Sequence, residues 1–226
     1  MKLLQTTAIA GLLVASGAAS ALELSGNVAL TTDYVWRGAS QTAGAPAIQG
    51  GFDADLGNGL YAGVWASNVD GGVEVDLYAG LNTSVAGLDL DIGVLHYAYP
   101  TSDNGTDFTE VYVGTTVALP LLGDVSISQS FGIDTGSDDT GGKNIGDYTA
   151  IGFGLGDHYG FAIAANLGYL NANDANVAGN ENAQDATDWK VSASKSMFGV
   201  DLEIAYTDSD QSESEDTVAL TISKSL

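Results

Sequence analysis

Residues 73–82 read VEVDLYAGLN, and the alternation in this stretch decides the fold class. Apolar side chains occupy every odd position from Val73 to Leu81, whereas Glu74 and Asp76 are among the even positions. Successive side chains of a β-strand point to opposite faces of the sheet. The stretch therefore predicts a strand with one apolar face and one polar face.

The same period of two recurs along the chain. The composition agrees with a β fold, because the 226 residues include 30 glycines, which weaken helices, and only six Lys and Arg residues. The twelve expected strands span residues 24–37, 46–56, 59–69, 72–84, 88–99, 107–119, 124–134, 147–155, 159–170, 187–196, 199–207 and 216–226.

The connections between these strands alternate between short and long, apart from the third. Short connections carry tight-turn residues such as Ala86-Gly87, and long ones carry acidic runs such as DSDQSESED at residues 208–216. An even number of strands with all the long loops at one end is typical of outer-membrane barrels. We expect an all-β fold, an up-and-down antiparallel transmembrane β-barrel of about twelve strands, formed by residues 22–226.

Residues 1–21 have the three parts of a signal peptide in the expected order. Lys2 supplies the positive charge, residues 3–14 are apolar, and Ala19-Ser20-Ala21 fits a cleavage site. We expect a mature chain that begins at Leu22 and is exported to the cell outer membrane. The alternative interpretation is a buried N-terminal helix. After this segment no apolar run is long enough for a transmembrane helix.

Alternation alone does not say which face of the barrel is apolar. A soluble barrel buries its apolar face, whereas a membrane barrel turns that face to lipid and keeps a polar interior. The polar faces here are rich in Asp, Glu, Asn and Tyr, and a soluble surface usually carries lysine as well. The formal charge of −23 also excludes nucleic acid as a partner. These features favour the membrane barrel, with a soluble ligand-binding barrel as the alternative.

Aromatic residues in the apolar phase support this orientation. They fall near the long-loop ends of their strands, where a membrane barrel carries a girdle at the outer interface. In a soluble barrel the same residues would be ordinary core residues. The expected girdle consists of Trp36, Tyr169, Trp189 and Tyr206.

The polar phase defines the side chains that we expect inside the barrel. A lumen lined by carboxylates favours cations. The expected lining and constriction residues are Asp33, Arg37, Asp53, Asp55, Glu74, Asp76, Asp89, Asp91, Glu110, Asp201 and Glu203. The aromatic residues expected to obstruct the lumen in part are Tyr61, Trp65, Tyr78, Tyr97, Tyr99 and Tyr112.

Arg37 is one of the few cations of the chain and falls in the polar phase of the first strand. Asp33, on the same strand, is too far along it for a direct pair, at roughly 13 Å. We expect Arg37 to reach across the upper lumen to a carboxylate on a distant strand, or to a loop folded inward. It would form one side of a constriction, or else a structural latch for the first long connection.

Residues 33–42 read DYVWRGASQT, and further uncommon residues follow at regular spacing. They are Pro46-Ala47, then QGGFD at residues 49–53, then Gly59, Tyr61, Gly63, Trp65 and Ser67-Asn68. This block resembles the N-terminal block of the Gcw_chp family, also called TorF-family porins. The resemblance implies a proteobacterial outer-membrane barrel of the porin type. It implies no catalytic residue or established substrate.

Catalytic and metal-binding patterns are weak. Cysteine is absent, and the two histidines, His96 and His158, fall at an interfacial position and in a turn. We therefore expect no enzyme, no catalytic residue, no metal site and no cofactor. The acidic loops do not match a calcium-binding loop, so we expect them to be solvated. The alternative is that they bind divalent cations weakly.

These observations predict a monomeric outer-membrane channel for small solutes, with a preference for cations. Its expected partners are outer-membrane lipid and lipopolysaccharide, small solutes or cations, and the outer-membrane assembly machinery. The alternative is a barrel with a closed lumen that acts as a surface-binding or structural protein through its acidic extracellular loops.

Overall fold

The computed structural model describes residues 22–101, 107–119, 123–133, 145–172, 184–211 and 215–226. The expected signal peptide lies outside these residues, as do parts of the acidic connections for which we considered divalent cations. Within the described residues, no helix is long and apolar enough to cross a membrane.

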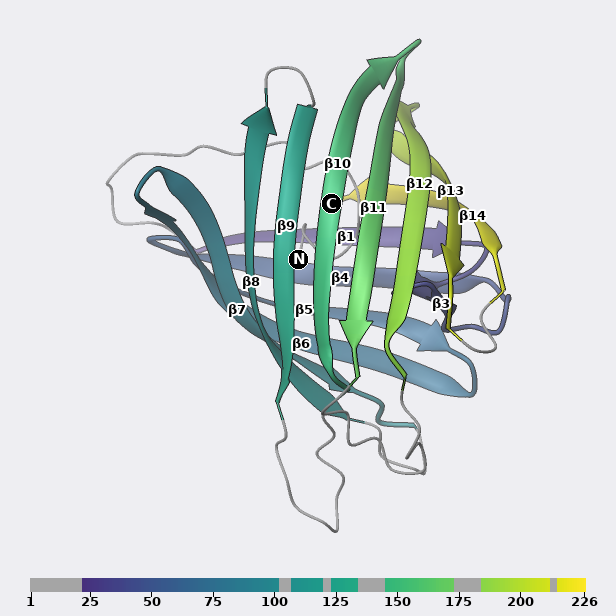
Figure 1. Ribbon diagram of the computed structural model, residues 1–226, viewed down its shortest axis with the longest axis horizontal. Coiled ribbons are helices and arrows are strands. Elements are labelled where there is room, and N and C mark those ends of the chain that lie inside the picture. The colour runs from purple at the N-terminus through teal and green to yellow at the C-terminus, as the bar shows by residue number, and fades with distance from the viewer. Residues whose placement is uncertain (1–21, 102–106, 120–122, 134–144, 173–183, 212–214) are drawn as a thin grey trace.

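Twelve strands close into one antiparallel barrel, as predicted. Figure 1 shows β8–β12 at the front of the barrel wall, with β1, β4 and β5 behind them. The barrel strands are β1 (Glu23–Thr31), β4 (Ala47–Gly57), β5 (Leu60–Val69), β6 (Gly72–Val85), β7 (Leu88–Ala98), β8 (Phe108–Leu119), β9 (Gly123–Ile133), β10 (Asp147–His158), β11 (Phe161–Asn171), β12 (Ala186–Met197), β13 (Val200–Ser209) and β14 (Thr217–Ser225).

Each strand pairs with its neighbours in the chain, and β1 closes the ring by pairing with β14. In this closing pair Asn27 faces Ser225 and Thr31 faces Thr221. Closure leaves no unpaired strand edge in the ring. Two short strands, β2 (Val35–Trp36) and β3 (Ala39–Ser40), pair only with each other and are not part of the barrel sheet.

The short connections are tight turns whose residues have positive φ. Ala86-Gly87, Tyr159-Gly160 and Phe198-Gly199 each place both residues in the left-handed region. This geometry matches the right-handed twist of the paired strands in two-residue hairpins. The chain thereby reverses within two residues at one end of the barrel, and the longer connections gather at the other end.

In each strand, the set of alternate residues that is apolar faces outward. Leu30, Phe52, Leu77 and Ile222 are all at least half exposed, although their strands are fully paired. The alternate positions are buried in the interior, where polar residues such as Glu110 lie. This is the reverse of a soluble barrel and the arrangement of a membrane barrel, with an apolar band outside and polar groups inside.

Candidate functional site

The first long connection, residues 32–46, folds into the barrel. Asp33, Arg37 and Thr42 within it are almost completely buried. Its base is held by the carboxylate of Asp33, which accepts hydrogen bonds from the hydroxyls of Ser40 (2.6 Å) and Thr42 (2.7 Å). Buried polar groups require such partners, so Asp33 gives the segment a fixed shape.

Arg37 and Gly38 form the turn between β2 and β3, with φ of 47° and 82°. Left-handed φ does not continue a strand. The prediction of one strand over residues 24–37 was therefore wrong beyond Thr31, where β1 ends. Arg37 lies at the tip of the hairpin that β2 and β3 form inside the barrel, and not on the barrel wall. We call residues 32–46, which contain it, the hairpin.

The side chain of Arg37 reaches β8 and forms an ion pair with Glu110. Its Nη2 lies 2.8 Å from the Glu110 carboxylate, and both side chains are at least 95% buried. The guanidinium also lies between two rings, 4.3 Å from the centre of Trp36 and 4.1 Å from that of Tyr148. The planar guanidinium is suited to this combination of an ion pair with stacking on aromatic faces.

The hairpin also contacts the opposite wall, through residues that the sequence analysis had not named. The hydroxyl of Tyr148 on β10 donates to Asp188 on β12, at 2.8 Å. A Cβ added to Gly38 would lie 2.7 Å from the Cβ of Asp188 and 2.5 Å from that of Ser209 on β13. The tip therefore packs directly on β12 and β13. Asp188 precedes the outward Trp189, so strand alternation indicated its inward position.

Two further buried carboxylates lie on β6. Glu74 accepts hydrogen bonds from the hydroxyls of Tyr34 (2.8 Å) and Tyr99 (2.6 Å). Asp76 is equally buried, and its Oδ1 has no hydrogen-bond partner among the described residues. With Glu110, Asp33 and Asp188, these groups give the upper lumen five buried acids near one buried arginine among the described residues.

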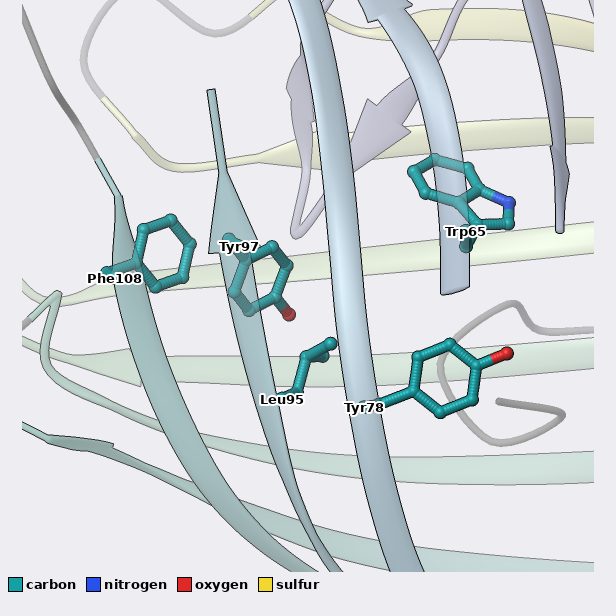
Figure 2. Packing of buried hydrophobic residues seen from close by; sticks show 5 residues of the cluster. All are labelled: Trp65, Tyr78, Leu95, Tyr97 and Phe108. Carbon is teal, nitrogen blue, oxygen red and sulfur yellow. The ribbon is translucent and has the colours of Figure 1, made fainter. Parts of the chain in front are cut away.

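Aromatic rings on β5–β8 support the hairpin from one side. Figure 2 shows Tyr97 and Phe108 side by side, and their centres are 4.2 Å apart. Trp36 packs on Tyr97 at 5.7 Å and on Phe108 at 6.1 Å. The prediction that Trp36 belongs to the outer aromatic girdle was therefore wrong. The reason is the same inward turn, which removes Trp36 from the alternation of β1.

The other three residues of the expected girdle point outward near the long-loop end. Tyr169 and Trp189 are exposed, and the ring of Trp189 lies 5.1 Å from that of Tyr206. The hydroxyl of Tyr169 donates to Asp185 at 2.7 Å. Their apolar rings thus lie beside polar groups, as at a membrane interface.

The remaining expected acids lie deeper in the barrel, towards the short turns, and are half-buried or exposed. Asp53 accepts a hydrogen bond from Tyr78, Asp89 from Ser84, and Asp201 from Ser196. Tyr61 donates to Asp91 at 2.5 Å. Lys190 pairs with Glu203 at 2.8 Å. The remaining member of this group, Asp55, accepts a hydrogen bond from the backbone of Gly57 at 2.7 Å.

The wall opposite the aromatic rings carries small side chains. Its buried inward residues include Ser130, Gly152, Gly168, Ser192 and Ala205, on β9–β13. Large aromatic side chains therefore gather on β5–β8, whereas β9–β13 carry mostly small inward residues together with Tyr148.

No group of three or more His, Asp or Glu side chains in the described part of the chain is arranged to hold a metal ion. Nδ1 of His96 lies 2.9 Å from the hydroxyl of Thr109, and Nε2 of His158 lies 3.0 Å from the carbonyl oxygen of Leu155. The hydroxyl beside His96 therefore belongs to a threonine side chain, and His158 contacts the backbone.

Comparison with known proteins identifies a family and a fold. The model of a family described as "Bacterial protein of unknown function (Gcw_chp)" matches residues 15–225. No curated protein matches the chain in sequence.

Three solved structures resemble the barrel. A structure described as the KdgM porin is 7% identical, with a TM-score of 0.59 over 89% of this chain and 97% of that chain. The NanC porin is 16% identical, with a TM-score of 0.55 over 89% and 98%. The COG4313 outer membrane channel from Pseudomonas putida F1 is 13% identical, with a TM-score of 0.54 over 94% and 99%. At these identities the likeness shows a shared fold.

Proposed function

We propose that this chain, which belongs to the Gcw_chp family, forms a channel for small solutes in the outer membrane. The outward apolar band supports insertion into lipid, and the polar interior supports an aqueous path. The porin fold that it shares with proteins named as porins or channels agrees with this proposal.

The observation that carries the proposal is the charge of the interior. Acids occur along its length, from Glu74, Asp76 and Glu110 near the hairpin to Asp91 and Asp201 towards the short turns. The described cations near them, Arg37 and Lys190, are each paired with one carboxylate. A lumen with this excess of carboxylates attracts cations and repels anions, so the channel prefers cations.

Residues 32–46 form the narrowest part of the path in this proposal. The hairpin extends from the β1–β4 side to Glu110 on β8 and to Asp188 on β12. Arg37 provides a positive charge there, opposite the buried acids of β6. A passing solute is therefore oriented by a field across the channel.

Planar-bilayer recording of the refolded protein tests the function. The expected result is a conductance with a reversal potential, across a potassium chloride gradient, that reports preference for potassium. This preference falls in 1 M salt, where the Debye length is only about 3 Å. Selectivity for chloride at low salt would contradict the cation proposal.

The burial of Asp33, Arg37 and Thr42 inside the barrel also favours a second candidate. If the hairpin never moves, the lumen is closed, and the protein acts as a surface-binding or structural barrel through its acidic loops. The absence of any conductance from protein that is folded and inserted would support this candidate.

The location has its own test. The protein should sediment with outer membranes, resist carbonate extraction and migrate differently on gels before and after heating. Recovery as a soluble periplasmic protein would reject the membrane assignment. We further propose that it is a monomer in contact with lipid and lipopolysaccharide, and that the outer-membrane assembly machinery inserts it.

A further inference from the structure

Asp76 occupies an unusual position on the inner face of β6. Its direct cross-strand partners are Trp65 on β5 and Tyr97 on β7. Side chains directly opposite one another in an antiparallel sheet lie about 5 Å apart at their Cβ atoms. The side chain of Asp76 therefore starts between those of Trp65 and Tyr97 in one row of the inner face, and both aromatic residues are buried.

Asp76 forms no ion pair with the described basic residues. Asp76 is only 2% exposed, and its Oδ1 accepts no hydrogen bond from any residue that the structure describes. Arg37 is paired with Glu110, and Lys190 is paired with Glu203. An unpaired buried carboxylate is costly in free energy, so an occupant that supplies positive charge would stabilise it.

The hairpin covers this position from above. Tyr34 packs edge-on against Trp65, with ring centres 5.4 Å apart. Trp36 packs in the same way against Tyr97, at 5.7 Å. Both residues that flank Asp76 are thus in contact with aromatic residues of the segment 32–46.

We infer that Asp76, Trp65 and Tyr97 form a binding site for a small organic ammonium ion. This inference rests on the proposed function, because it requires an interior that solutes enter. It adds the class of solute that the interior binds.

The chemistry of the site distinguishes an ammonium ion from a metal ion. A metal ion needs several oxygen ligands, and no suitable group of three acidic or histidine side chains occurs among the described residues. An alkylammonium ion needs one carboxylate as hydrogen-bond acceptor and aromatic faces around its charge, with tryptophan the best of them. Asp76 supplies the acceptor, and Trp65 and Tyr97 supply the faces.

The ligand enters when the hairpin lifts, because Oδ1 of Asp76 is covered in the structure. If only a fraction of the protein has the hairpin lifted, the apparent affinity for the ligand is lowered by that fraction. A substitution that loosens the hairpin without changing charge should therefore strengthen binding. Gly38→Ala is such a substitution, because its new methyl group would overlap Asp188 and Ser209.

The test is a titration of the refolded, detergent-solubilised protein with ethylammonium chloride at constant ionic strength, followed by tryptophan fluorescence. Wild-type protein should show a saturable change that potassium chloride does not reproduce. Asp76→Asn should weaken binding roughly tenfold or more, because a hydrogen bond to a charged group is lost. Asp124→Asn is the matched control, since it removes an exposed acid at the start of β9 and should leave binding unchanged.

Several outcomes would overturn the inference. They are no saturable change in the wild type, an equal response to potassium, full binding by Asp76→Asn, or no tighter binding by Gly38→Ala. The wild-type titration and the Gly38→Ala result decide the matter even if Asp76→Asn fails to fold. Bilayer conductance without saturable binding would reject the site and keep the channel, whereas binding without conductance would reject the channel and keep the site.

Discussion

The upper and lower parts of the barrel interior use the same chemistry with different results. In both, tyrosine hydroxyls donate to carboxylates: Tyr99 to Glu74 above, and Tyr61 to Asp91 below. Above, the acids Glu74 and Glu110 are almost completely buried, whereas the lower acids keep contact with solvent. The difference comes from residues 32–46, which fill only the upper part.

The carboxylates of the two parts therefore have different roles, which the composition alone does not reveal. A carboxylate in contact with water adds to the overall field and has little influence on structure. A buried carboxylate depends on its partner, so the upper groups hold the hairpin in place. Matched substitutions in the two regions test this distinction.

The largest effect is expected from the two ion pairs. Arg37→Ala leaves Glu110 buried without its partner, which should lower the free energy of unfolding by about 3–5 kcal/mol, or release the hairpin to protease. Lys190→Ala breaks the pair with Glu203, whose side chains are 23% and 13% exposed, so water can reach the remaining carboxylate and the loss should be smaller. Urea titration and limited proteolysis measure both. Equal losses for the two variants would remove the distinction between the regions.

A smaller effect is expected from two glycines with positive φ. Gly199→Ala at φ 79°, in the short turn between β12 and β13, meets no atom within 4 Å, so only backbone strain of about 1–2 kcal/mol is expected. Gly38→Ala at φ 82° adds overlap with Asp188 and Ser209, and should cost clearly more. Thermal unfolding of the two variants gives the comparison. If both lose the same stability, the hairpin tip does not pack on β12 and β13 as described.

The smallest effect is expected from two tyrosine hydroxyls. Tyr148→Phe removes the donor to the buried Asp188 and should cost about 1–3 kcal/mol. Tyr61→Phe removes the donor to Asp91 in the lower part, where water can replace it, so the loss should be smaller. Urea titration of both variants checks this order. A larger loss for Tyr61→Phe would show that the lower interior is the drier one.

Most of the barrel could be predicted from the sequence, because alternation and turn residues are local signals. Residues 73–82 predicted a two-faced strand, and β6 contains them. The inward hairpin was missed because the residues before Arg37 continue the alternation of β1. A signal was nevertheless present: Arg37-Gly38 has the same form as the turns Ala86-Gly87 and Phe198-Gly199.

The candidate site was predictable only in part. Alternation placed Glu74, Asp76 and Glu110 on the inner face, since that assignment needs no knowledge of distant strands. The partner of Arg37 depends on how the ring closes and where the hairpin lies across it. Those are long-range properties, so neither Glu110 nor Tyr148 could be assigned to Arg37 from sequence.

The central claim is that the hairpin narrows the channel, and shortening the hairpin tests it most directly. The amide of Gln41 donates to the carbonyl of Tyr34 at 2.6 Å, so two glycines can replace residues 35–40 and still close a turn. Single-channel recording of this variant should show a conductance several-fold larger than that of the wild type, in a barrel that keeps its cation preference. A folded variant with the wild-type conductance would contradict the account.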